Sequence, residues 1–187
     1  SFNASVDWYH YFGDFQANLL VEGFYTKLSD PFVLTPPVKD PDGSAYLIQT
    51  RINGSGAKVY GGTLEGKVAY KDKVQLQAGL TLQRSIYDSP EEWSADEEHL
   101  SEKERYSDKI LRTPDVYGYF TATYMPVKAF SIALNGNYTG RMYVPHLLSE
   151  VNGEADVLVK SPDFFELGTK IAYDFDFQGF CLQLNAG

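Results

Sequence analysis

Hydrophobic and polar residues alternate along this chain in long stretches with a period of two. One such stretch runs from Phe130 to Met142. Its apolar positions are Phe130, Ile132, Leu134, Tyr138 and Met142, and its polar positions are Ser131, Asn135, Asn137, Thr139 and Arg141. Because successive side chains of a β-strand point to opposite sides of the sheet, this pattern predicts a strand with one apolar and one polar face. The alternation extends well beyond the roughly 5–6 residues of an ordinary globular strand.

The same pattern predicts about eight strands, joined in pairs by short turns. The pairs are Phe2–Phe12 with Phe15–Leu28, Ala57–Tyr70 with Val74–Tyr87, two strands within Thr113–Tyr143 around the turn Met125–Lys128, and Phe164–Phe175 with a strand from Phe180. Three long connections separate the pairs, at Ser29–Asn53, Asp88–Arg112 and Val144–Asp163. The predicted fold class is all-β: an antiparallel, up-and-down transmembrane β-barrel segment with short periplasmic turns and long external loops.

The long connections carry their own local signals. Four prolines in the first one exclude a central strand, while Tyr46–Ile52 fits a short strand inside the loop or an outward extension of the next strand. Asp40–Gly43 has the composition of a turn, and it also resembles part of a calcium loop without the remaining ligands. In the second connection we expect a helix that begins at Ser89 as N-cap, with Trp93 and Leu100 on one face. Its acidic residues either form a solvated helix face or attract a cationic ligand.

Composition narrows the possible functions. The formal net charge is −9 and no basic stripe is present, which argues against a nucleic-acid partner. The chain contains no run of about 18 apolar residues, so the sequence predicts no transmembrane helix. Cys181 is the only cysteine, so a disulfide framework within the chain is excluded. On pattern alone, a small soluble lipocalin-like barrel that binds an apolar ligand remains the alternative, with the apolar face turned inward.

Three stretches resemble the C-terminal part of the barrel of TonB-dependent outer-membrane receptors. They are VEGFYTKLSDPF (Val21–Phe32), AKVYGGTLEGKVAY (Ala57–Tyr70) and LRTPDVYGYFTATYMPVKAFSIALNGNYTGRMYVPH (Leu111–His146). The final QLNAG also resembles the start of a strand that usually continues further in this family. We therefore expect residues 1–187 to be a partial barrel domain, without the plug domain, the TonB box and the closing strands.

The resemblance implies a barrel of about 22 strands around an N-terminal plug. Such receptors reside in the outer membrane and take up a scarce nutrient, such as a metal–siderophore complex, cobalamin or a glycan. The implied partners are outer-membrane lipid, the plug domain, a TonB-type energy-coupling protein and the small-molecule or glycan ligand. An isolated segment would also leave two unpaired sheet edges, which predicts closure on itself or edge-to-edge association between copies.

Candidate site residues come from the two faces of the predicted strands and, in the case of Trp93, from the second long connection. Ligand or lumen candidates are Glu65, Asn135, Asn137, Arg141 and Trp93, and membrane-girdle candidates are Trp8, Tyr11, Phe12, Phe15 and Tyr124. Arg84 falls on the apolar face, where its long side chain can reach the outer rim. No nucleophile–base pair, cofactor fingerprint or metal-ligand spacing stands out, so we expect neither an enzyme nor a cofactor protein.

Overall fold

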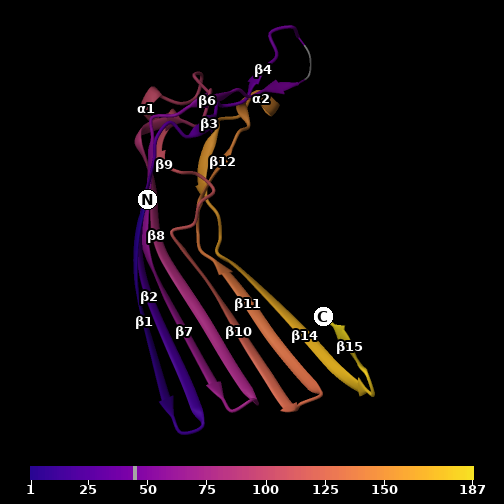
Figure 1. Cartoon of the computed structure of the whole chain (residues 1–187). Helices are drawn as coiled ribbons and strands as arrows, with labels where there is room; N and C mark the ends of the chain where they lie inside the picture. The colour runs from indigo at the N-terminus through magenta and orange to yellow at the C-terminus, as the bar shows by residue number, and fades with distance from the viewer. Residues whose placement is uncertain (44–45) are drawn as a thin grey trace.

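The computed structural model describes residues 1–43 and 46–187, which form one long antiparallel sheet with a cap of loops at one end (Figure 1). The sheet strands lie side by side in chain order. They are β1 (Phe2–Phe12), β2 (Phe15–Leu28), β7 (Ala57–Tyr70), β8 (Val74–Glu92), β10 (Val116–Val127), β11 (Phe130–Thr139), β14 (Phe164–Phe177) and β15 (Phe180–Ala186). This is an up-and-down meander of eight long strands, as the alternation predicted.

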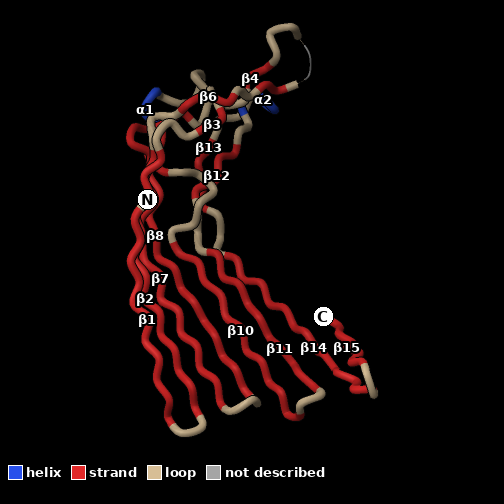
Figure 2. Tube along the Cα trace, in the orientation of Figure 1, coloured by secondary structure: helices blue, strands red, loops and turns tan. Residues whose placement is uncertain are grey.

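All four short turns lie at the end of the sheet opposite the cap (Figure 2). The predicted bounds of β1, β2 and β7 agree with the structure. Gly13 and Gly179, in the first and last of these turns, have φ of +62° and +103°, a backbone region that suits glycine. The third turn is tighter than expected, because β10 continues to Val127, which pairs directly with Phe130.

The helix expected from Ser89 is wrong. Strand β8 instead continues to Glu92, because the backbone of this region pairs with β9 (Tyr106–Lys109), where Glu92 lies opposite Tyr106. A short helix, α1 (Glu102–Arg105), forms later in the same connection. The Glu104 carboxylate accepts hydrogen bonds from the Ser101 N–H at 3.0 Å and from the Ser101 hydroxyl at 2.6 Å, so a capping pair at Ser101 and Glu104 starts the helix.

The cap also contains three small hairpin-like pairs and a second helix. The pairs are β3 (Phe32–Leu34) with β6 (Arg51–Asn53), β4 (Val38–Lys39) with β5 (Leu47–Ile48), and β12 (Tyr143–His146) with β13 (Val157–Lys160); the helix is α2 (Ser149–Asn152). The short strand expected within Tyr46–Ile52 is therefore divided between β5 and β6. Asp40–Gly43 forms a turn, in which the Gly43 N–H donates to the Asp40 carbonyl at 3.0 Å. Neither helix of the described residues is long or apolar enough to cross a membrane.

The sheet has one apolar face and one polar face, and neither is covered by a second layer (Figure 1). Large apolar side chains such as Leu80 and Leu64 are 44% and 51% exposed. Among the described residues only Ala57, Trp93 and Ala172 are buried hydrophobic residues. The edge strands β1 and β15 do not pair with each other within the described residues. The described chain therefore does not form the small closed barrel with an apolar interior that the lipocalin-like alternative requires.

Glycines in the sheet interior make room for aromatic rings on neighbouring strands. The Phe120 ring on β10 covers Gly136 of β11, so closely that a Cβ atom at Gly136 would clash with it. On the polar face, the Tyr119 ring covers Gly79 of β8, and a Cβ there would lie 2.6 Å from the ring. An aromatic ring over a glycine fills the space that the missing side chain leaves and helps to fix the strand register.

Candidate functional site

The centre of the polar face holds a three-residue cluster from three adjacent strands. Glu65 of β7, Gln77 of β8 and Tyr119 of β10 are brought together by the register of these strands. The Gln77 side-chain amide donates to Glu65 Oε1 and to the Tyr119 hydroxyl oxygen, each at 2.9 Å. The Tyr119 hydroxyl donates to Glu65 Oε2. The sequence pointed to Glu65, whereas its partners became evident only from the strand register.

We expect the Tyr119→Phe substitution to loosen this cluster, because it removes a donor to Glu65 and an acceptor from Gln77. Because these hydrogen bonds are exposed, their loss is expected to cost about 0.5–1.5 kcal/mol of folding stability, which is measured by thermal unfolding in detergent. Tyr117 lies on the same face of the same strand and no hydrogen bond of its hydroxyl is seen among the described residues. The Tyr117→Phe variant is therefore the control, and equal melting temperatures for both variants would contradict the role assigned to Tyr119.

The other lumen candidates occupy different positions. Asn135 and Asn137 lie on the polar face of β11, with Asn137 opposite Tyr119 and Asn135 close over Gly168. Arg141 follows the end of β11, and its Nε lies 3.6 Å from Asp163 Oδ1 in an exposed pair. Trp93 is not on the sheet wall at all. It is buried inside the cap, where its indole N–H donates to the Glu104 carbonyl at 2.8 Å, and it lines a cavity of about 610 Å³ between the loops.

Four of the five girdle candidates lie on the apolar face, near the end with the short turns. Trp8 stacks on His10 at 5.4 Å between ring centroids, and His10 in turn contacts Phe12 at 4.1 Å. Phe15 contacts Tyr70 at 4.6 Å, and Tyr124 lies between Val74 and Ile132. Tyr11 differs from the rest, because it alternates onto the polar face of β1 with Asp7 and Tyr9.

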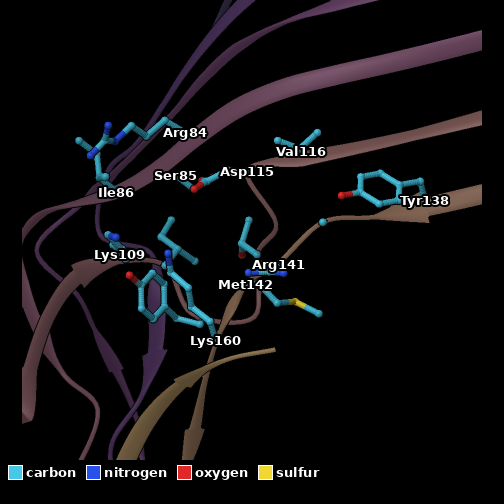
Figure 3. A pocket seen from close by; sticks show the side chains of 14 residues that line it. Arg84, Ser85, Ile86, Lys109, Asp115, Val116, Tyr138, Arg141, Met142 and Lys160 are labelled. Carbon is cyan, nitrogen blue, oxygen red and sulfur yellow. The ribbon is translucent and has the colours of Figure 1, made fainter. Parts of the chain in front are cut away.

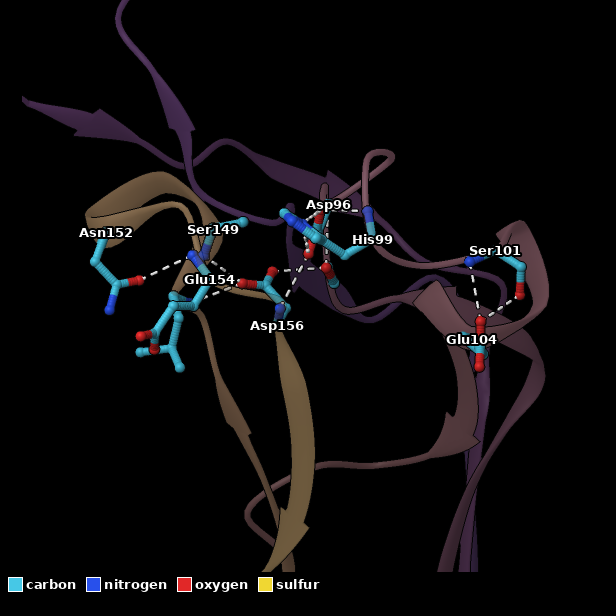
Figure 4. Close-up of polar contacts among 10 residues, drawn as sticks. Asp96, His99, Ser101, Glu104, Ser149, Asn152, Glu154 and Asp156 are labelled. Atoms are coloured by element: carbon cyan, nitrogen blue, oxygen red, sulfur yellow. Dashed lines mark hydrogen bonds and ion pairs between the residues drawn. The ribbon is translucent and has the colours of Figure 1, made fainter.

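A buried polar network joins two loops of the cap (Figure 4). The Asp156 carboxylate accepts hydrogen bonds from the Ser94 hydroxyl at 2.6 Å and from the backbone N–H groups of Leu148 and Ser149 at 2.7 and 2.8 Å. The Asp156 N–H donates to Asp96 Oδ2 at 3.0 Å. Ser94, Asp96 and Asp156 are 0%, 4% and 2% exposed. Nothing in the spacing of these residues indicates this contact, because the two aspartates are far apart in the chain.

The hydrogen bonds of this network shift the pKa values of Asp156 and His99. Burial by itself raises the pKa of Asp156, but the hydrogen bonds from Ser149, Ser94 and Leu148 outweigh it and hold the pKa below its ordinary value. The hydrogen bond to Asp96 raises the pKa of His99. A carboxyl group whose pKa is lowered on folding stabilises the folded state when the pH is above its pKa in the unfolded chain, about 4. This contribution is lost as the pH falls through the lower pKa of the folded state.

A second cavity, of about 440 Å³, lies where the cap joins the sheet (Figure 3). Backbone hydrogen bonds frame it: the Gln83 N–H donates to the Asp115 carbonyl at 2.8 Å, and the Arg112 N–H to the Tyr143 carbonyl at 2.8 Å. Its lining includes the side chains of Ser85, Lys109, Arg141, Tyr143 and Lys160. The Lys109 and Lys160 ammonium groups lie 4.3 and 5.2 Å from the centroid of the Tyr143 ring. Lys109, Tyr143 and Lys160 were not among the candidate residues that the strand pattern indicated.

Two solved structures share the arrangement of the long sheet. The copper transporter OprC matches with a TM-score of 0.51 and 14% identity, over 93% of this chain and 23% of its own. The FrpB iron transporter from Neisseria meningitidis (F3-3 variant) matches with a TM-score of 0.50 and 14% identity, over 98% of this chain and 25% of its own. This chain has the fold of a wall segment of a TonB-dependent transporter barrel.

The barrel segment spans about a quarter of the length of the two transporters it matches. Both of these are described as transporters. Scans with protein-family models and with curated protein sequences found no match. The fold that the three sequence stretches led us to expect is thus confirmed by structure.

Proposed function

We propose that this chain is part of the barrel wall and external loops of an outer-membrane, TonB-dependent uptake protein. The observation that carries the proposal is the uncovered meander with one apolar and one polar face, which matches transporter barrels over 93–98% of the chain. In such a barrel the apolar face meets lipid, the polar face lines the lumen, and the cap of loops lies outside the cell. Trp8, Phe12, Phe15 and Tyr124 then belong to the periplasmic aromatic girdle.

The remaining wall and a plug domain would come from the rest of a longer protein. The polar face then faces the plug, and Glu65, Asn135 and Asn137 are the residues we propose to contact it or the passing ligand. A TonB-type energy-coupling protein would act on the plug. Because the two matched proteins are described as copper and iron transporters, we propose a scarce metal, carried as a complex such as a metal–siderophore, as the nutrient; cobalamin and glycans are the competing classes.

Site-directed labelling of the intact protein in outer-membrane vesicles tests the orientation. In a Cys181→Ser background, Leu80→Cys should react with a lipid-soluble probe and resist a water-soluble maleimide. Asn137→Cys, one row away on the polar face, should show the opposite reactivity. Maleimide labelling of Leu80→Cys together with protection of Asn137→Cys would overturn the membrane assignment.

An uptake assay tests the nutrient. Cells with and without the intact gene are supplied with radiolabelled ferric or cupric complexes, with cobalamin, or with an oligosaccharide mixture. We expect the gene to be required for accumulation of one metal complex, and for this to cease when TonB is inactivated. Gene-dependent uptake of cobalamin or glycan, but of no metal complex, would contradict the proposed nutrient class.

A further inference from the structure

The cavity at the junction of cap and sheet gathers positive charge in a protein that is otherwise acidic. Lys109 of β9, Lys160 of β13, Arg84 and Arg141 line it together with one acidic residue, Asp115, although the chain carries a formal charge of −9. The Lys109 and Lys160 ammonium groups both lie over the Tyr143 ring. Figure 3 shows Arg141 near the two lysines, whereas the Arg84 side chain extends away from them. Neither Lys109 nor Lys160 forms an ion pair with a carboxylate within the described residues.

The positive charges of Lys109 and Lys160 act on the hydroxyl of Tyr143, which lies between them. A hydrogen bond from Lys109, together with the charges of Lys109 and Lys160, lowers the pKa of Tyr143. Each ammonium is also within about 6 Å of the ring centroid, the range of a cation–π contact. These contacts hold the lysines in place without neutralising them, so their charge remains available to a ligand.

Ser85 provides an independent indication of a ligand. It is 7% exposed, it lines the cavity, and its hydroxyl oxygen is buried without a hydrogen-bond partner in the protein. A buried hydroxyl without a partner is destabilising, and such groups are rare in folded proteins. The cavity volume of about 440 Å³ falls within the ~300–1,000 Å³ of small-molecule sites.

We propose that this cavity binds the carboxylate or phosphate groups of an anionic ligand. Lys109 and Lys160 supply unpaired positive charge, Ser85 supplies a hydrogen bond, and Arg141, which is paired with Asp163, is a further cation at the site. Arginine and lysine side chains around a partly enclosed cavity are well suited to such groups. One part of this inference rests on the proposed function: that the anion is the chelating part of a transported metal complex. The same chemistry also fits a lipid phosphate at the outer rim, so the two sources must be separated.

Calorimetric titration of the purified intact protein in detergent tests the site. Citrate serves as the soluble tricarboxylate probe, and detergent-dispersed phosphatidic acid as the lipid probe, both at low salt. The Lys109→Gln/Lys160→Gln double variant should bind the preferred probe at least tenfold more weakly, and Ser85→Ala a few-fold more weakly. Lys160 is exposed, so Lys160→Gln alone should fold normally and still bind several-fold more weakly, while Lys160→Arg should restore binding.

Lys103→Gln is the matched control, because Lys103 is an exposed lysine of α1 outside this cavity. Preference for citrate indicates a soluble ligand, and preference for phosphatidic acid indicates a lipid headgroup. If neither probe binds the wild type, or if Lys160→Gln and Lys103→Gln bind as the wild type does, the proposal is overturned. The labelling of Leu80→Cys and Asn137→Cys uses no anion, so reversed faces would refute the membrane assignment and leave the titration result unaffected.

Discussion

The Leu80→Arg substitution is expected to prevent most of the protein from reaching its folded form in the outer membrane. Leu80 lies near the middle of β8, between Leu64 of β7 and Gly118 of β10, and is 44% exposed on the apolar face. An arginine at the bilayer midplane of a barrel costs about 2–4 kcal/mol. That cost lowers the folded-to-unfolded ratio by roughly 30-fold to 1,000-fold. The folded fraction is measured by heat-modifiable migration of outer-membrane fractions on unboiled gels.

Asn137→Arg is the control at almost the same depth. Asn137 is exposed on the polar face. In the sheet register it lies in one row with Tyr119 and Gly79, and Gly79 is the chain neighbour of Leu80. On the polar face the added charge meets water and polar groups instead of lipid, so we expect Asn137→Arg to reduce assembly far less than Leu80→Arg does. Normal assembly of Leu80→Arg with failure of Asn137→Arg would mean that the faces are reversed.

The Asp156→Ala substitution is expected to loosen the loop of residues 147–160 and to weaken its contact with the loop of residues 93–105. At a position that is 2% exposed, it removes the acceptor of two hydrogen bonds within its own loop, from Leu148 and Ser149, and of one from Ser94 of the other loop. The bond from the Asp156 N–H to Asp96 remains. Each buried donor left without a partner costs about 1–3 kcal/mol, and the three costs are not additive. A net loss of about 3 kcal/mol would raise the rate of hydrogen exchange of the Leu148 and Ser149 amides roughly a hundredfold.

Two variants bracket this result. Glu154→Ala removes an exposed carboxylate two residues away. Within the part of the chain that the structure describes, the only hydrogen bond of Glu154 runs from its backbone N–H to Asn152, and alanine keeps it. The Leu148 and Ser149 amides of this variant should therefore exchange as in the wild type. Ser94→Ala removes one of the three donors from the other loop and should raise exchange by a smaller factor. Unchanged protection in Asp156→Ala would show that the loops are held by contacts other than this carboxylate. The amides of the sheet strands should exchange at the wild-type rate in all of these variants, so they serve as an internal reference.

The loop after β8 and the loop after β11 are joined by the Ser94–Asp156 and Asp96–Asp156 hydrogen bonds. The Trp93 indole and the Arg105 guanidinium, which pairs with Glu92 at 2.7 Å, hold the first loop against the end of β8. The loop cap is therefore a joined unit attached to the wall, and a substitution at Asp156 tests that unit without touching the sheet.

Local signals predicted the strands and turns well. Strand alternation depends only on neighbouring residues, and each of the eight long strands was readable from it, including the bounds of β1, β2 and β7. The prediction failed at Ser89–Glu92, where helix-capping residues were overridden by pairing of β8 with β9. A local propensity of a few tenths of a kcal/mol per residue gives way when an extended backbone gains partners on a neighbouring strand.

The sequence by itself determined the all-β class, the long strands and the separation of apolar from polar positions, because each of these depends on residues that are adjacent in the chain. Only the tertiary structure decided which side chains meet. Glu65 gains Gln77 and Tyr119 through the register of three strands, and Asp96 meets Asp156 because two loops fold over the same end of the sheet. Lys109, Tyr143 and Lys160 converge for the same reason. Contacts of this kind are set by the path of the whole chain, which no short-range pattern encodes.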